Sequence, residues 1–394
     1  MLFQTFDDKQ DCVLVYQNHK FFKDFDNLDL SHTWAYAPYL KHLDLEYGRI
    51  WTEGKSLSDV CPTSLQEEFN IIEKKMKGVV RSCRETQLSL DDICFYELMP
   101  SWLLKDYAQI KDRICAHVFA TYPKPSNYDH ILNLIKVVAD IKHRPLELDL
   151  TKIKGNSVRE RNLLRNIKKS ARRVLYDPYK TKTGRLATSP GSFPVMTLPK
   201  KYRGMIQPTN DWLYELDFNA AELRTMLGVL GHEQLQEDLH AWNIKNLFKS
   251  GCARDEAKKR IFAWLYNAGS RDKEISGIYN REKVKALFHK DDRVTTPFER
   301  EIQCDDFHAV NYTIQSTAAD ILFEQMYKIW QLLESKKSFI KFCNHDSIII
   351  DLAIEDEKII RPIKNLFVDT RYGEFQATCF GGKNWGDMRK LNIF

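Results

Sequence analysis

The spacing of hydrophobic positions predicts helices in one long stretch of the chain. Within residues 98–173, apolar side chains recur at intervals of three and four, as at Leu132, Ile135 and Val138. This is the period of helices that pack through one face. We therefore expect a helical region there.

The preceding region has a different pattern. Residues 12–16 form a short apolar run typical of a strand, and acidic turns surround it. Ser64, with Glu67 three residues later, is typical of a helix N-cap. Residues 1–95 are thus expected to form a small α/β unit.

A proline-punctuated stretch, residues 177–208, precedes a second strand-like segment that begins at Trp212. The apolar pattern then changes from strand to helix, which places Asp217 at the end of the strand. A carboxylate on such a rigid edge can hold a metal ion. It can equally do no more than cap the following helix.

Residues 339–351 contain two apolar runs on either side of a polar tip, Asn344-His345-Asp346-Ser347. This pattern predicts a β-hairpin whose turn displays Asp346. The same four residue types also suit an ordinary turn without any chemistry.

Arg254, Lys258, Phe262 and Tyr266 follow one another at steps of four residues. On a helix they form one stripe about 18 Å long, with two cations at one end and two aromatic rings at the other. This order matches a nucleoside triphosphate, with its phosphates at the cations and its base against the rings. The alternative is an amphipathic helix that buries Phe262.

Composition narrows the class of protein. A chain of 394 residues is expected to form two or three packed units, and no run of apolar residues has the length of a membrane span. The first eight residues do not resemble a secretion signal, so we expect a cytoplasmic protein. Nine cysteines without any Cys-x-x-Cys pair indicate reduced thiols, not a zinc site or a disulfide framework.

Positive charge is concentrated in one segment. Residues 152–203 contain 15 Lys and Arg against two acids, a net charge of +13, whereas the rest of the chain carries −8. This asymmetry is expected of a surface that follows a polyanionic backbone. A solvated helix face without any partner would show the same run of bases.

Three of these patterns resemble motifs A, B and C of the family A (DNA polymerase I-like) DNA polymerases, in the order in which they occur along the chain. The segment with Asp217 resembles motif A, the stripe from Arg254 to Tyr266 resembles motif B, and the tip with His345 and Asp346 resembles motif C. The resemblance runs from about residue 98 to the end of the chain. Further segments resemble other parts of the family: Thr183-Gly184-Arg185-Leu186, Asp238-Leu239-His240, the segment from Asn311 through Gln315 to Ile321, and Asn384-Trp385 near the end.

The resemblance implies an α+β, right-hand polymerase fold with an antiparallel-sheet palm, helical fingers and a helical thumb. The expected domains are residues 1–95 as a truncated, exonuclease-like α/β remnant, 96–205 as thumb and basic primer-template segment, 206–232 as palm with motif A, 233–299 as fingers with the motif B helix, and 300–394 as palm with motif C. Asp44-Leu45-Glu46 is the only early Asp-x-Glu, and only about 50 residues separate it from the helical region, too few for a complete proofreading exonuclease. The compact fingers, the reduced N-terminal region and the small total size imply a phage or viral enzyme.

The implied reaction is the extension of a primer 3′-hydroxyl with dNTPs by a two-metal mechanism that uses Mg²⁺ or, as a substitute, Mn²⁺. Asp217 and Asp346 are the expected metal ligands and act with Lys258 in catalysis. The expected nucleotide-binding residues are Arg254, Lys258, Phe262, Tyr266, Glu222 and His240. The expected DNA-binding residues are Arg185, Asn311, Gln315, Thr183, Arg203 and His345.

The implied partners are primer-template DNA, dNTPs, and a separately encoded exonuclease or helicase-primase. Three departures from the family pattern stand out: Ser347 replaces the usual Glu of motif C, Asn267-Ala268-Gly269 follows Tyr266, and Phe307 replaces an arginine. Two alternatives remain, a single-subunit RNA polymerase-like enzyme and a catalytically silent DNA-binding relative.

Overall fold

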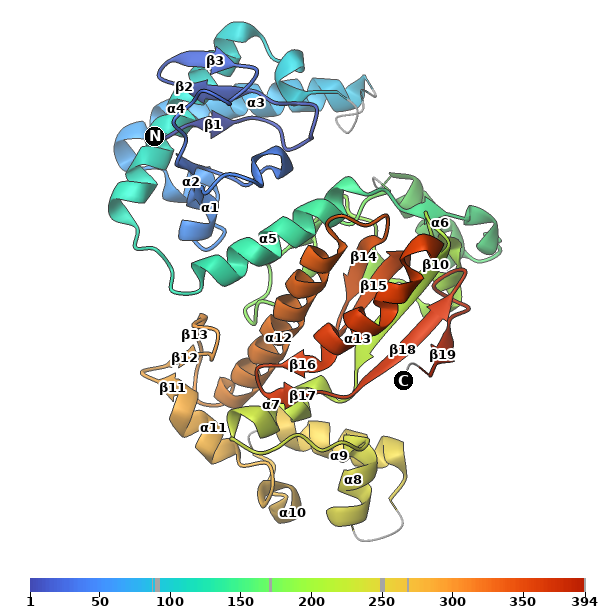
Figure 1. Cartoon of the computed structure of the whole chain (residues 1–394). Coiled ribbons are helices and arrows are strands. Elements are labelled where there is room, and N and C mark those ends of the chain that lie inside the picture. The colour runs from blue at the N-terminus through green and yellow to red at the C-terminus, as the bar shows by residue number, and fades with distance from the viewer. Residues whose placement is uncertain (87, 89–92, 170–171, 249–251, 268, 393–394) are drawn as a thin grey trace. The chain divides into compact units, whose positions relative to one another are not determined.

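The computed structural model describes the chain except residues 87, 89–92, 170–171, 249–251, 268 and 393–394. The chain divides into two compact units, Met1–Asp140 and Ile141–Phe394 (Figure 1). The division falls inside the segment 96–205, which the resemblance assigns to the thumb.

The N-terminal unit combines short strands with two long helices. Helices α3 and α4 pack against each other, and Phe69, Met76 and Ile114 belong to their shared core. Ser64 lies in a 3-10 turn, Thr63–Leu65, that precedes α3, so it is not the predicted N-cap. The elements are β1 (Gln4–Thr5), β2 (Val15–Gln17), β3 (Lys20–Phe22), β4 (His32–Thr33), β5 (Glu46–Tyr47), α1 (Gly48–Trp51), α2 (Leu57–Val60), α3 (Gln66–Glu85), α4 (Ser101–Thr121) and α5 (Tyr128–His143).

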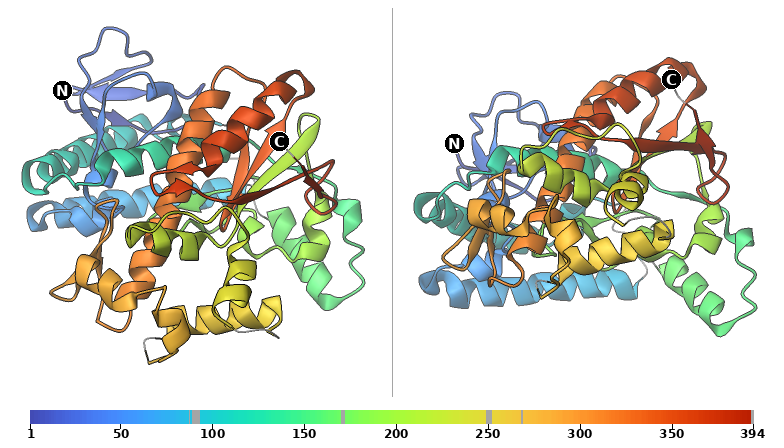
Figure 2. Two further views of the ribbon diagram at one scale, coloured as in Figure 1. Left: turned by 60° about the horizontal axis from the view of Figure 1, so that its bottom comes forward. Right: turned by 90° about the horizontal axis from the view of Figure 1, so that it is seen from below.

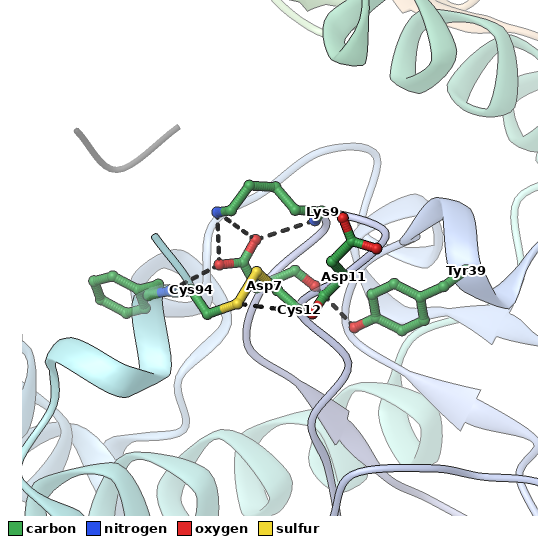
Figure 3. Close-up of a disulfide and its surroundings, with 7 residues drawn as sticks. Asp7, Lys9, Asp11, Cys12, Tyr39 and Cys94 are labelled. Atoms are coloured by element: carbon green, nitrogen blue, oxygen red, sulfur yellow. Dashed lines mark hydrogen bonds and ion pairs between the residues drawn. A yellow bond between two sulfur atoms is a disulfide. The ribbon is translucent and has the colours of Figure 1, made fainter. Parts of the chain in front are cut away.

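A disulfide joins Cys12 to Cys94, whose Cα atoms are 5.3 Å apart (Figure 3). The prediction that all cysteines are reduced is wrong for this pair. With a sequence separation of 82, no local spacing signals the bond. Tertiary contacts bring the two segments together, because the Asp7 carboxylate accepts hydrogen bonds from the Phe95 backbone N–H at 2.8 Å and from Lys9 at 2.7 Å.

The C-terminal unit is built around one antiparallel sheet. Its strand order is β14-β15-β10-β18-β19. The elements of this unit are β6 (Glu147–Leu148), α6 (Val158–Lys169), β7 (Tyr176–Asp177), β8 (Ala187–Thr188), β9 (Ile206–Gln207), β10 (Trp212–Phe218), α7 (Ala221–Val229), α8 (Leu239–Asn246), α9 (Arg254–Tyr266), α10 (Lys273–Ser276), α11 (Arg281–Phe288), β11 (His289–Lys290), β12 (Arg293–Thr295), β13 (Glu301–Gln303), α12 (Ala309–Leu333), β14 (Phe339–Asn344), β15 (Ser347–Leu352), α13 (Ile360–Val368), β16 (Asp369–Thr370), β17 (Gly373–Glu374), β18 (Ala377–Gly382) and β19 (Arg389–Leu391).

Helices cover one face of this sheet. Helix α13 packs against β10 and β18, and α12 packs against β14 (Figure 1). On β10 the Phe218 ring stacks on Phe367 of α13, with the ring centroids 4.0 Å apart. Because side chains alternate along a strand, Glu215 and Asp217 project from the opposite face of β10.

A second core forms where α7, α8, α9 and α11 meet. Leu223 and Met226 of α7 join Ile261 and Trp264 of α9 there. Helices α8 to α11 gather on one side of the unit, as the yellow and orange ribbons of Figure 2 show. The predicted α+β class is confirmed. No helix among the described residues has both the length and the hydropathy of a membrane span.

Candidate active site

Two aspartates from distant parts of the chain lie side by side at one end of the central sheet. Asp217 is near the end of β10, and its Cα partner across the ladder is Ser347, the first residue of β15. Asp346 directly precedes Ser347 in the two-residue turn between β14 and β15. Its carbonyl oxygen is 3.5 Å from the Phe218 backbone nitrogen. The predicted hairpin is confirmed, and its turn is closed by His345 with a left-handed φ of 55°.

The surroundings of Asp217 disfavour its charged form. Burial raises the pKa of Asp217 to about 7, and the nearby charges of Asp346 and Glu215 add to the effect, while Lys258 and Lys200 oppose it. A cation would relieve this cost. The donors are hard carboxylate oxygens, which are the ligands that Mg²⁺ prefers. The two aspartates therefore fit a divalent metal, and they are the residues that would hold it.

Glu222, Arg185 and Tyr266 form a linked group next to the aspartates. The buried Glu222 carboxylate accepts hydrogen bonds from the Arg185 guanidinium and from the Tyr266 hydroxyl. Burial raises the pKa of Glu222, although both donors oppose this shift. The sequence analysis assigned Glu222 and Tyr266 to the nucleotide and Arg185 to the DNA, and the structure joins all three in one hydrogen-bond network.

Helix α9 carries the predicted stripe. The rings of Phe262 and Tyr266 stack with centroids 5.6 Å apart, and the Lys258 ammonium lies 5.7 Å from the Phe262 centroid. Arg254, at the first position of the helix, forms an ion pair with Asp238 at 3.0 Å. The amphipathic alternative is partly right, because Phe262 also packs against the neighbouring core.

Asp238 connects three elements of the site. Its carboxylate accepts bonds from the Ala241 backbone N–H at the start of α8, from the Asn219 side chain, and from Arg254. Burial alone would raise the pKa of Asp238, but these bonds outweigh it and hold the pKa at about 2. Asp238 thereby fixes the start of α9 relative to α8, which carries His240.

His240 is buried, and its Nδ1 has no hydrogen-bond partner among the described residues. Burial lowers its pKa, and the positive charge of Arg254 acts in the same direction. Its ring centroid is 6.4 Å from that of Phe262. A buried nitrogen without a partner, next to the cationic end of the stripe, fits a bound ligand.

A cavity of about 230 Å³ adjoins the turn of the hairpin. Arg185, Glu222, His345 and Asp346 line it together with apolar residues of α12. Of the other predicted DNA-binding residues, Thr183 is buried one position before Gly184, whose φ is +72°.

The remaining predicted DNA-binding residues differ in their surroundings. Gln315 on α12 lies within hydrogen-bonding range of Tyr266. Asn311 has a buried side-chain oxygen without a partner in the described part of the chain. Arg203 stacks on the Trp385 ring, 4.0 Å from its centroid, and its charge acts on Glu215.

The basic segment presents several of its charges to solvent. On α6, Arg159, Arg161 and Arg165 are exposed. Exposed cations on one helix suit a polyanionic partner, although exposure alone does not identify it. Ser170 and Ala171 of this segment, and Ala268 after the stripe, lie outside the described residues.

The sequence analysis missed two groups. Glu215 received no role, although its position two residues before Asp217 places both on the same strand face. Arg300 and Asp320 form a buried, bidentate ion pair with N–O distances of 2.7 and 3.1 Å. Arg300 also packs against Gly184, where an added Cβ would lie 2.4 Å from the guanidinium carbon. No short-range pattern signals that contact.

Comparisons with known proteins point in the same direction as the geometry. No family model matches the chain. An 85-residue segment is 34% identical to DNA polymerase I of Borreliella burgdorferi; it covers 20% of this chain and spans only 9% of that relative. The structure is similar to the POL domain of Pol1 from M. smegmatis, solved in complex with DNA primer-template and dNTP, with a TM-score of 0.57 at 12% identity over 73% of this chain and 76% of that one. The chain has the fold of a DNA polymerase I polymerase domain.

Within that fold, the sheet with Asp217 and Asp346, the loop that carries Arg185, and the helices that carry Glu222 and Tyr266 belong to one compact unit. The same unit contains every residue that the sequence analysis assigned to metal, nucleotide or DNA. The N-terminal unit contains none of them.

Proposed function

We propose that the chain is a template-directed DNA polymerase of family A that extends a primer 3′-hydroxyl with dNTPs. The observation that carries this proposal is that Asp217 lies next to the turn that carries Asp346, at one end of the central sheet, in a fold shared with a polymerase domain. In this proposal the sheet is the palm, α8 to α11 belong to the fingers, and residues 96–205 contain the thumb.

Asp217 and Asp346 are proposed to hold Mg²⁺. Bound Mg²⁺ supplies activation of the primer hydroxyl and charge stabilisation at the α-phosphate and the leaving pyrophosphate. The protein contributes two carboxylates at fixed positions on paired strands. Because the turn at His345 and the register at Ser347 fix their spacing, the site needs little rearrangement to bind ions.

Helix α9 is proposed to bind the incoming dNTP. Arg254 and His240 would bind phosphate oxygens, and Lys258 would neutralise developing charge and protonate the leaving pyrophosphate. Phe262 and Tyr266 would contact the base and sugar. Tyr266 and Glu222, joined by a hydrogen bond, fill the space next to the sugar. A ribose 2′-hydroxyl would therefore clash with them and would find no free hydrogen-bond partner there.

The DNA is proposed to lie along Arg185, Thr183, Asn311, Gln315, Arg203 and His345. The exposed cations of α6 would add attraction to phosphates that is independent of sequence. Copying any template requires contacts of this kind.

The N-terminal unit is proposed to lack proofreading activity of its own. Glu46 of the early Asp-x-Glu forms ion pairs with Lys124 at 2.7 Å and His32 at 3.1 Å. These pairs occupy a carboxylate that an exonuclease would need for metal. A compact, phage-type replication enzyme assisted by a separate exonuclease is the corresponding biological role. Degradation of 3′ ends that Asp44→Ala abolishes would refute this.

Primer extension tests the main proposal. The intact chain is incubated with a primed single strand, Mg²⁺ and either dNTPs or rNTPs, next to the variants Asp346→Ala and Glu282→Gln, the latter an exposed acid on α11. We expect extension with dNTPs by the wild type and Glu282→Gln and none by Asp346→Ala. Extension with rNTPs alone would identify an RNA polymerase, and DNA binding without any extension would identify a silent relative.

A further inference from the structure

Ser347 and Glu215 form a contact that the proposed mechanism does not use. The Ser347 hydroxyl donates a hydrogen bond to Glu215 Oε1 at 2.8 Å. Ser347 is buried in the first position of β15, directly opposite Asp217. The serine therefore holds a third carboxylate on the strand that carries Asp217.

The position of Glu215 directs its charge to the metal ligands. Glu215 and Asp217 alternate with the helix-packed side chains of β10, so they share the free strand face. Glu215 is close enough to Asp217 for its charge to act on that carboxyl. Because its bond comes from a neutral hydroxyl, the bond fixes the carboxylate without cancelling its charge.

We propose that Glu215 is the third acidic group of the metal-binding site and that Ser347 holds it in place. This inference rests on the proposed function. The acid that the resemblance to motif C leads one to expect at position 347 is supplied from the neighbouring strand, two residues before Asp217.

Glu215 does not bind the metal ion directly. Its charge acts on the ion held by Asp217 and Asp346, so Glu215 is a positioning residue. Within the described part of the chain, no three acidic, histidine or cysteine side chains are grouped closely enough to hold one ion together. A carboxylate on the same strand face as a metal ligand strengthens cation binding electrostatically and can bind a water of the ion's hydration shell. The charge of Glu215 also interacts with that of Arg203. The rival explanation is therefore that Glu215 has a purely structural role.

Direct measurement of metal binding tests the inference. Free Mn²⁺ is quantified by electron paramagnetic resonance with the intact chain, a dideoxy-terminated primer-template and the next dNTP. Glu215→Gln keeps the shape and the acceptor for Ser347 but removes the charge. We expect Mn²⁺ to bind about 10- to 100-fold more weakly, as for other groups that support metal ligands. Glu374→Gln, an exposed residue of β17, is the matched control.

The double variant Glu215→Gln/Ser347→Glu returns a carboxylate to position 347. We expect it to recover most of the Mn²⁺ affinity, while the melting temperature of Glu215→Gln stays close to that of the wild type. A structural role would instead lower the melting temperature of Glu215→Gln, and Ser347→Glu would not restore binding. Either that result or unchanged Mn²⁺ affinity in Glu215→Gln overturns the inference.

The two proposals fail in different ways. If the wild type extends primers and Asp346→Ala loses Mn²⁺ binding, but Glu215→Gln binds Mn²⁺ normally, only the role of Glu215 is wrong. If the wild type neither extends primers nor binds Mn²⁺, the proposed function is wrong and the role of Glu215 falls with it.

Discussion

Phe262 and Tyr266 lie one turn apart on α9, with their rings stacked at 5.6 Å. Under the proposed function, the sugar of the incoming nucleotide contacts Phe262. A dideoxynucleotide lacks the 3′-hydroxyl, and the Phe262 ring has no polar group that could replace it. We predict that Phe262→Tyr raises the incorporation of dideoxynucleotides relative to dNTPs about tenfold or more, equivalent to about 1.4 kcal/mol. Chain termination in a mixture of both nucleotides measures the ratio.

Phe307→Tyr is the control for this change, because Phe307 is an exposed ring in the loop before α12. Phe307→Tyr should incorporate dideoxynucleotides relative to dNTPs in the same ratio as the wild type. Equal incorporation by Phe262→Tyr and the wild type would count against the assignment of α9 to the nucleotide.

Lys111 is a buried cation in the N-terminal unit. Its ammonium donates to the Thr5 carbonyl at 2.6 Å, and burial lowers its pKa to about 8. Between pH 8 and about 10 the unfolded chain therefore binds more protons than the native one. We predict that, relative to the variant Lys111→Met, the free energy of unfolding of the wild-type unit rises by about 1 kcal/mol per pH unit within that window.

Labelling of the buried Cys115 thiol in urea, corrected for thiol ionisation, measures this free energy. Lys111→Met removes the titrating group, so its unfolding free energy should lose the rise with pH. Parallel pH profiles of the wild type and Lys111→Met would show that Lys111 keeps its ordinary pKa, because the titration of the Cys115 thiol, whose pKa burial raises, is common to both.

Among the elements, α12 is tied to the segment before β13 by the ion pair of Asp320 with Arg300. Asp320 is fully buried, and its removal takes two carboxylate hydrogen bonds from the Arg300 guanidinium, which also packs on Gly184. We predict that Asp320→Ala lowers the free energy of unfolding by about 3–5 kcal/mol, as for other broken buried pairs. Urea titration of the intact chain measures the loss.

The pair of Arg293 with Glu301 provides the comparison. Its atoms are 2.6 Å apart, but both side chains are half exposed. Glu301→Ala should cost less than about 1 kcal/mol. Equal losses in the two variants would mean that Asp320 is not screened from water as the structure indicates.

Elements with a strong local period were predictable from the sequence. The stripe on α9 follows from a repeat of four residues and the hairpin around Asp346 from two apolar runs that flank a polar tip, and both have the expected form. Side chains along a strand alternate with a period of two. The placement of Glu215 on the same face as Asp217 follows from the same period of two, but its bond to Ser347 depends on strand register. Register is set by the whole sheet, so the sequence could not reveal that contact.

Contacts between distant segments were not predictable. The bond of Arg185 to Glu222 and the contact of Arg300 with Gly184 join residues that no repeat relates. The disulfide was missed for the same reason, since it depends on how Asp7 positions the Phe95 backbone. Such contacts arise from packing, which a one-dimensional pattern does not encode.

At the scale of the whole molecule, the residues of the proposed active site and the disulfide lie in different units. Every residue proposed to bind metal, nucleotide or DNA lies in Ile141–Phe394, whereas Cys12 and Cys94 lie in Met1–Asp140. Loss of the disulfide should therefore affect the stability of the N-terminal unit without affecting DNA synthesis.

Cys94→Ser tests this separation. The disulfide closes a loop across a sequence separation of 82, and cross-links of that span stabilise by about 4–5 kcal/mol in the chain-entropy account. We predict that Cys115 becomes labelled at lower urea concentration in Cys94→Ser, while the rate of primer extension at 25 °C stays within about twofold of the wild type. The wild type treated with a reductant should behave like the variant, and the variant should not respond to it. A large loss of extension in Cys94→Ser would mean that DNA synthesis depends on the folded N-terminal unit, because the cross-link touches none of the proposed catalytic residues.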